Sequence, residues 1–382
     1  MAALSSARWP VESYEEGIEL CFDKGWTDGL PVVLPTPEKV QAFLDHAGRE
    51  PGEVVGRIPE RNRDLTAENV AVNAVMAGCR KEYLPVVLAA VRAVTSPRFE
   101  FNHLASMGSP TPMLIVSGPI VRELGLNSEG WLLGPGSRAN ASIGRALSLV
   151  LWNCAELRPS GIQRGTYGNP LRWASGCIAE NAEGAGEVTL REYLGFDRED
   201  STVTVHSNCG AFTQVWTMKP GIRDTLLSIS DALVAGSGNF NRGVYVVLVA
   251  PSIVRRFAKE GWALRDVREW LVANSGRTLA DLKRRGFPPA GEAHGLWGSD
   301  PRAAGGDPVR DGIAAGVVAD GDEERFVHLF ASNGELDELV WSESQLTRET
   351  DVYLVTAGAD VSYGCIVLPE YDVSTAPVTV RI

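Results

Sequence analysis

The sequence predicts an α/β protein in which a layered mixed sheet packs against helices. Three short apolar segments, Met113 to Val116, Tyr245 to Val249 and Val352 to Val355, each end in a turn of small residues. Helical patterns follow the first two, and such alternation is typical of α/β layers. These two units are also alike in sequence, Leu-Ile-Val-Ser-Gly-Pro-Ile-Val-Arg and Val-Leu-Val-Ala-Pro-Ser-Ile-Val-Arg. The likeness predicts two related α/β halves, 1–200 with a helical N-terminal part and 201–382, with a single domain as the alternative.

Local signals mark the other elements. Thr36 is typical of a helix N-cap and Pro37 of a first helical position, and Thr66 begins a further helix. Val and Thr alternate between Ser201 and His206, which predicts a strand. The glycine-rich stretches 155–188 and 286–312 are expected to be loops. Helices are expected over residues 11–25, 37–48, 66–78, 86–94, 120–124, 141–154, 224–234 and 253–259.

Composition narrows the range of functions. The chain has 382 residues and a net charge of −12, so no surplus of positive charge exists to neutralise a nucleic acid or an anionic membrane. No apolar run approaches the roughly 20 residues that a membrane span needs. Six cysteines are widely spaced without a Cys-x-x-Cys pair, and the N-terminus resembles no signal peptide. We therefore expect a cytoplasmic protein with free thiols.

Two cysteines stand in polar, glycine-containing surroundings. Cys79 and Cys177 each follow a Gly, and each is followed three residues later by a Glu, Glu82 or Glu180. A thiol near cations can have a lowered pKa and act as a nucleophile. The alternative for each is a small buried hydrophobe, which is how free cysteines commonly behave.

A third cysteine follows the predicted strand 201–206. His206 and Cys209 could form a nucleophile–base pair or two ligands of a metal ion. The alternative is a tight turn that needs Asn208 and Gly210. Five histidines without paired spacing argue against a dedicated histidine metal site.

Several residues are candidates for binding a substrate. The loop Gly134, Gly136, Ser137, Arg138 and Asn140 precedes a long helix, where backbone N–H groups and an arginine could bind an anion. A loop that merely caps the helix is the alternative.

Three further candidates are Asn181, His103 and Asp28. A lone histidine is more often structural than catalytic, and Asp28 in a Trp-Thr-Asp-Gly turn is typical of a turn former. An acid in that turn could nevertheless face a pocket.

The chain resembles a bacterial family of uncertain function. The likeness lies in Asp28-Gly-Leu-Pro-Val-Val, Asn73-Ala-Val-Met-Ala-Gly-Cys79, Gly134-Pro-Gly with Arg138-Ala-Asn-Ala, Ala179-Glu-Asn and Asp200-Ser-Thr-Val-Thr-Val. Family members are often associated with small proteins that carry a selenocysteine- or cysteine-Gly-Ser-Cys motif. The resemblance thus implies thiol, selenol or sulfur-transfer chemistry.

The chain also departs from the family pattern. The acidic stretch after Glu-Asn is reduced to residues 182–185, and a C-terminal segment that carries His in the family reads Ala357 to Tyr363 without one. These departures suggest a specialised branch, with a role in biosynthesis.

Taken together, these features predict an enzyme in which Cys79, Cys177 or Cys209 reacts with a small anionic substrate and Glu82 or Glu180 moves protons. A metal-dependent lyase or hydrolase that uses Cys209 and His206 is one alternative. A non-catalytic partner subunit of a small thiol or selenol protein is the other. The cofactor is left open, and a homo-oligomer is compatible with the sequence.

Overall fold

The computed structural model describes residues 3–106, 108–159, 161–172, 176–186, 188–208, 212–237, 240–285, 307–341, 346, 348–361, 364–370 and 376–382. Its α-helices are α1 Tyr14–Asp23, α2 Pro37–Ala47, α3 Ala67–Met76, α4 Leu84–Val94, α5 Ile120–Glu123, α6 Arg138–Cys154, α7 Leu190–Tyr193, α8 Ile222–Gly236, α9 Pro251–Lys259, α10 Leu264–Asn274, α11 Leu279–Arg284, α12 Pro308–Ala314 and α13 Glu335–Val340. Its strands are β1 Val54–Ile58, β2 Arg63–Thr66, β3 Thr111–Ser117, β4 Cys177–Ala179, β5 Thr202–Asn208, β6 Thr213–Trp216, β7 Val244–Val249, β8 Gly276–Thr278, β9 Phe326–His328, β10 Asp351–Thr356, β11 Gly364–Leu368 and β12 Val378–Arg381.

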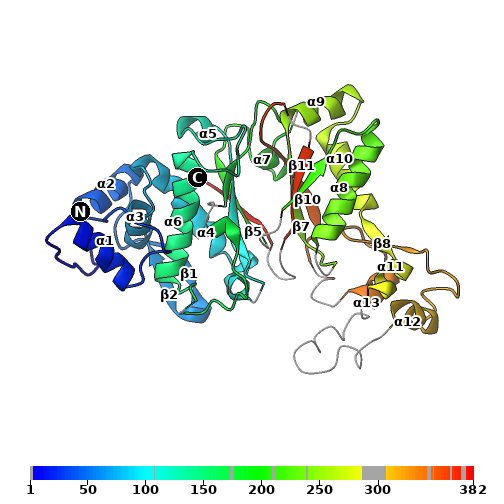
Figure 1. Cartoon of the computed structure of the whole chain (residues 1–382), viewed down its shortest axis with the longest axis horizontal. Coiled ribbons are helices and arrows are strands. Elements are labelled where there is room, and N and C mark those ends of the chain that lie inside the picture. Colours follow the sequence, from blue (N-terminus) through cyan, green and yellow to red (C-terminus); the bar gives the residue numbers. More distant parts are fainter. Residues whose placement is uncertain are drawn as a thin grey trace.

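The described part of the chain forms four layers, which confirms the predicted α/β class. Two four-stranded mixed sheets, in the orders β12-β5-β3-β4 and β10-β7-β11-β6, lie face to face. Helices α4 and α6 cover the outer face of the first sheet, with α3 packed on these two helices, and α8, α9 and α10 cover the outer face of the second sheet (Figure 1). The contact between the sheets contains an apolar cluster that includes Met113 and Ile115 of β3 and Val246 and Leu248 of β7. Because side chains alternate between the two faces of a strand, one face of each sheet packs against the helices and the other packs against the second sheet.

The two large sheets share one pattern of strand directions. β3 lies between the parallel strand β4 and the antiparallel strand β5, just as β7 lies between β10 and β11. The registers correspond as well, since Val203 of β5 is opposite Val116 and Cys365 of β11 is opposite Val249. Val116 and Val249 occupy the same position in the two similar sequence segments. The likeness in sequence therefore reflects two related structural units.

Each unit supplies the edge strand of the other sheet. β6 follows β5 in the chain but pairs with β11, and β12 follows β11 but pairs with β5. A β-bridge between Asn208 and Glu370 joins the segments that leave β5 and β11. The boundary expected at residue 200 lies before β5, a strand of the first sheet, and β12 joins that sheet from the expected second half. The two halves are thus linked by exchanged strands.

Local capping signals explain why several helices begin where the sequence predicts. Thr36 accepts a hydrogen bond from the Lys39 N–H at the start of α2, and Gly48 ends that helix in the left-handed conformation. Thr66 and Asn69 form a reciprocal capping box at the start of α3. These hydrogen bonds satisfy N–H groups that a helix leaves unpaired.

The structure bears differently on the two stretches that the sequence predicts to be loops, 155–188 and 286–312. The stretch 155–188 was predicted to be loop, but Cys177 begins β4, which pairs in parallel with β3 and is buried. A three-residue strand is too short to show a readable alternation, which explains the wrong prediction. Most of the other expected loop, residues 286–306, lies outside the described residues, and α12 begins at its end.

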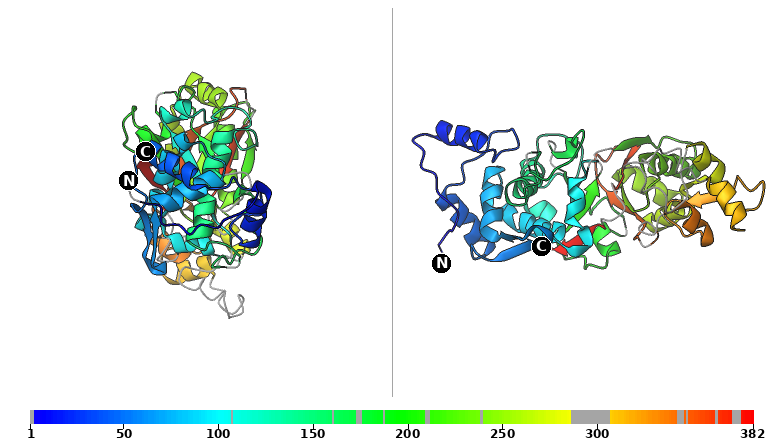
Figure 2. Two further views of the ribbon diagram at one scale, coloured as in Figure 1. Left: turned by 90° about the vertical axis from the view of Figure 1, so that its left-hand side faces the viewer. Right: turned by 90° about the horizontal axis from the view of Figure 1, so that it is seen from below.

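The helical N-terminal part forms one end of the molecule. α1 and the segment before it lie at the end opposite α12 (Figure 2). Among the described residues, no helix has both the length and the apolar character needed to cross a membrane.

Candidate ligand-binding site

A cavity of about 660 Å³ lies between the N-terminal segment, residues 4–11, and helices α1, α2, α3 and α6. We call it the N-terminal cavity. Its size falls in the range of pockets that bind small molecules. Its wall is mostly apolar and includes Trp9, Leu20, Trp26, Leu34, Val72 and Met76.

The N-terminal segment is held over this cavity by a buried carboxylate. Glu68 of α3 accepts hydrogen bonds from the backbone N–H groups of Ser5 and Ser6 and from the Ser5 hydroxyl, at 2.8–3.0 Å. Burial raises the pKa of Glu68, but these hydrogen bonds outweigh it and leave the pKa below its ordinary value. Trp9 packs edge-on against Trp26, with ring centroids 5.9 Å apart. The segment is therefore anchored at both ends.

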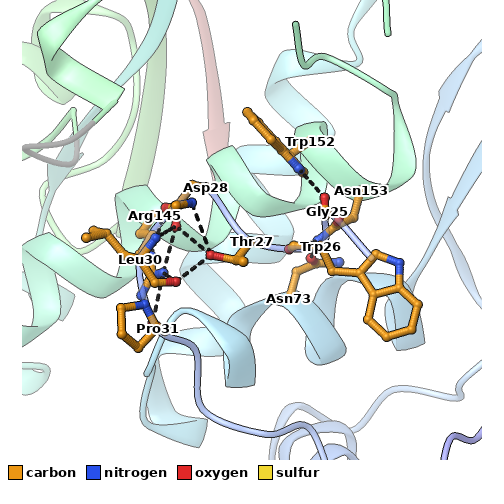
Figure 3. A network of polar contacts seen from close by, with 11 residues as sticks. Gly25, Trp26, Thr27, Asp28, Leu30, Pro31, Asn73, Arg145, Trp152 and Asn153 are labelled. Atoms are coloured by element: carbon orange, nitrogen blue, oxygen red, sulfur yellow. Dashed lines mark hydrogen bonds and ion pairs between the residues drawn. The ribbon is translucent and has the colours of Figure 1, made fainter. Parts of the chain in front are cut away.

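Helix α6 fixes the turn that separates α1 from α2. Figure 3 shows the turn, residues 25–31, lying along α6, with Arg145 at one end and Trp152 and Asn153 at the other. The Trp152 indole donates to the Gly25 carbonyl at 2.8 Å, and the Asn153 amide donates to the Trp26 carbonyl at 3.0 Å. This fixes Trp26 in the cavity wall.

Asp28, a predicted substrate-binding residue, is paired within the protein. Arg145 binds it with two hydrogen bonds of 2.9 and 2.8 Å and also donates to the carbonyls of Leu30 and Pro31 (Figure 3). Burial raises the pKa of Asp28, but Arg145 outweighs it and the pKa is lowered overall. The carboxylate therefore stays charged, and its ion pair with Arg145 holds the turn against α6.

A small polar cluster lies in the wall of the N-terminal cavity. Asn153 donates to the Asn73 side-chain oxygen at 2.7 Å, and Asn73 donates to the Cys154 sulfur at 3.5 Å and to the Asn69 carbonyl at 2.9 Å. Burial raises the pKa of Cys154 to about 11 despite the hydrogen bond from Asn73. The thiol is therefore neutral near pH 7, and the cluster offers hydrogen bonds rather than a reactive thiolate.

A second, more polar cavity of about 430 Å³ lies on the other side of the turn. Asp28, Ser148 and Trp152 line it together with the stretch 163–169, part of the expected functional loop. Ser109 also lines it, in a left-handed conformation with φ of 59°. The expectation that Asp28 could face a pocket thus agrees with its position.

The structure brings together two of the predicted cysteines. The Cys79 thiol donates to the Ser142 carbonyl at 3.3 Å, and the Cys177 carbonyl accepts from the Asn140 amide at 3.3 Å. Only 6% of Cys79 and 2% of Cys177 is exposed. Burial raises the pKa of Cys79 to about 12 and raises that of Cys177 as well, with a further contribution from the neighbouring Cys79. Both are neutral thiols inside the helix-facing core.

The predicted proton carriers lie elsewhere. Side chains alternate along β4, so Glu180 projects toward the contact between the sheets while Cys177 faces the helices. Glu180 accepts from the Ser117 hydroxyl at 2.5 Å and from the Leu190 N–H at 2.7 Å, and burial raises its pKa. Glu82 is half-buried in the short helix η2, Lys81–Tyr83.

Asn181 contributes to a turn that follows β4. Its side-chain oxygen accepts from the Gly184 N–H at 2.9 Å, and its backbone N–H donates to the Thr356 carbonyl at 2.7 Å. The second of these hydrogen bonds links the two sheets where β4 and β10 end.

The expected anion-binding loop is largely used to build the fold. Ser137 caps α6, and the Asn140 amide donates to the Asn127 carbonyl at 3.0 Å and accepts from the Asn127 N–H at 2.7 Å. Arg138 donates to the Gly78 carbonyl at 3.0 Å. A side chain at Gly134 would collide with the Trp131 indole, and Gly136 has a φ of 127°. Neither of the two cavities is lined by this loop.

The remaining predicted residues give no joint site. His103 lies in the short helix η4, Phe101–Ala105, 3.4 Å from the Glu100 carboxylate. His206 is buried between the sheets, and Cys209 lies outside the described residues. In the part of the chain that the structure describes, no three His, Cys, Asp or Glu side chains are grouped to hold a metal ion.

Sequence reasoning missed the residues of the N-terminal cavity. Asn73 interrupts the apolar set Val70, Ala74 and Val75 on a helix. A polar residue on the apolar face of a helix could have indicated a polar group inside the protein. Trp26 and Asn153 gave no such signal, because their importance depends on the packing of the turn against α6. No family model matches the chain, and no curated protein matches it. The family resemblance therefore stays an expectation.

Proposed function

We propose that this protein binds a small, largely apolar organic molecule in the N-terminal cavity. The observation that carries the proposal is the cavity itself, about 660 Å³ with two tryptophans in its wall. Large apolar pockets with a few polar groups are the usual sites of small-molecule binding. Cys154 in its wall is a neutral thiol, so binding is better supported than covalent catalysis there.

Titration with N-phenyl-1-naphthylamine, an apolar dye that fluoresces outside water, tests the proposal. The native protein should show saturable binding of one dye molecule, with quenching of tryptophan emission from Trp9 and Trp26. Val72→Trp fills the cavity from a half-exposed position on α3 and should weaken binding at least tenfold. Val54→Trp makes the same change on the exposed strand β1 and should leave binding unchanged. Equal binding by both variants would contradict the proposal.

Thiol or sulfur-transfer chemistry on an anionic substrate is the second candidate. It is supported by the convergence of Cys79 and Cys177 beside Arg138, whose charge acts to lower the pKa of Cys79. The burial of both thiols weighs against it. Replacing each cysteine singly with Ser and measuring sulfur loading tests it. Full loading in both variants would exclude these two residues as sulfur carriers.

A further inference from the structure

The amide of Asn153 has a fixed orientation in the wall of the N-terminal cavity. Its nitrogen donates both to the Trp26 carbonyl and to the Asn73 side-chain oxygen. The Asn73 oxygen cannot exchange places with its own nitrogen, which donates to the Asn69 carbonyl. Turning the Asn153 amide over would therefore place oxygen against two oxygens. The atom of Asn153 without a hydrogen-bond partner among the described residues must therefore be its side-chain oxygen.

This oxygen is buried and has no hydrogen-bond partner within the described ranges. Buried acceptors of this kind are rare in proteins, and each calls for an explanation. The polar neighbours in the same wall are satisfied: Glu68 accepts from Ser5 and Ser6, and Asn69 accepts from the Thr66 N–H at 3.0 Å. Among these wall groups, Asn153 alone offers an unused acceptor.

We infer that the ligand of the N-terminal cavity is a mostly apolar molecule with one hydroxyl or N–H group that donates to the Asn153 side-chain oxygen. This inference rests on the proposed function. The apolar wall accommodates the body of the molecule, and the Glu68 carboxylate in the same wall is already occupied by the N–H groups of Ser5 and Ser6. Because the oxygen is covered in the free protein, a donor reaches it through a small side-chain movement, which is common on binding.

A matched pair of probes tests this inference on the unmodified protein. 2-Naphthol and 2-methoxynaphthalene share one ring system, but only the naphthol can donate a hydrogen bond. A purely apolar cavity would favour the ether, because the naphthol hydroxyl loses its hydrogen bonds to water. We expect the opposite order, with naphthol bound at least tenfold more tightly in fluorescence titrations.

Two variants assign the preference to one residue. Asn153→Ala should reduce the naphthol preference to within about twofold. Asn69→Ala removes from the same wall a side chain whose oxygen already accepts from Thr66, so it should keep the preference. Equal affinity of the two probes in the native protein would overturn the inference but leave the proposed function intact. A preference that survives Asn153→Ala would overturn the role of Asn153. Failure of both probes and of the naphthylamine dye to bind would overturn the proposed function itself.

Discussion

The chemistry of the cysteines depends on burial more than on their neighbours in sequence. Arg80 and Lys81 follow Cys79 directly, yet both are exposed, and the cation that acts on the thiol is Arg138 of α6. Burial outweighs this charge and raises the pKa of Cys79 to about 12. The polar residues next to Cys79 in the sequence are therefore a poor guide to the pKa of its thiol. Cys79 and Cys177 nevertheless lie beside the same segment, because Arg138 donates to the Gly78 carbonyl and Asn140 donates to the Cys177 carbonyl.

Alkylation by iodoacetamide at pH 8 should reveal the difference between these thiols. A pKa of about 11 rather than about 9 lowers the thiolate fraction of Cys154 about 100-fold, so its labelling should slow by that factor relative to the unfolded chain. Cys79 and Cys177 should react more slowly still, because they are also buried. Mass spectrometry of the labelled peptides over time measures each rate. Labelling of Cys79 or Cys177 at the rate of the unfolded chain would restore the case for thiolate catalysis.

At the scale of elements, the N-terminal segment depends on one side chain of α3. The Glu68 carboxylate binds two adjacent backbone N–H groups, a task that only an acceptor can perform. Its pKa is lowered in the folded state, so its stabilising effect is present above the unfolded pKa and is lost as pH falls through the lowered value. The segment should therefore stay attached at pH 5.

Glu68→Gln should release this segment. The amide loses the charge and keeps only one acceptor oxygen, and its NH2 group replaces the oxygen that accepts from the Ser5 N–H and hydroxyl. An exposed Arg8 in the segment gives trypsin a cleavage site. We expect cleavage after Arg8 to be at least tenfold faster than in the native protein, as followed by mass spectrometry at pH 8. Glu53→Gln, at an exposed surface pair with Arg49, is the matched control and should leave the rate unchanged. Equal rates in all three proteins would show that Glu68 does not hold the segment.

The helices and strands that could be predicted were those marked by a pattern within their own residues. Caps at Thr36 and Thr66 mark the starts of two helices, and unbroken apolar runs mark β3 and β7. The short strands β4, β6, β11 and β12 were missed, because a strand of three to five residues is defined by its partner rather than by its own pattern. The N-terminal cavity was missed for the same reason, since Trp26 and Asn153 acquire their roles only when the turn packs on α6.

At the scale of the whole molecule, the exchange of edge strands joins the two α/β units. β6 and β12 each complete a sheet whose other strands belong to the other unit, a pairing between segments far apart in sequence. The contact between the sheets contains a buried polar link, in which the His206 ring nitrogen Nε2 lies 2.8 Å from the Val244 carbonyl. Because a carbonyl only accepts, this nitrogen carries the proton. The two sheets should therefore unfold together.

The pH dependence of unfolding tests whether the contact between the sheets contributes to stability. Burial lowers the pKa of His206 to about 4, against about 6.5 in an unfolded chain. Between these values the unfolded state binds a proton that the folded state does not, so stability should fall as pH falls from about 6.5 to 4, by ~3 kcal/mol in total. His206→Gln keeps a hydrogen-bond donor but cannot titrate, so its urea-unfolding free energy should fall less over this range by that amount. Contributions from carboxylates are common to both proteins and cancel in the difference. Parallel curves for the two proteins would mean that the pKa of His206 is not lowered in the folded state.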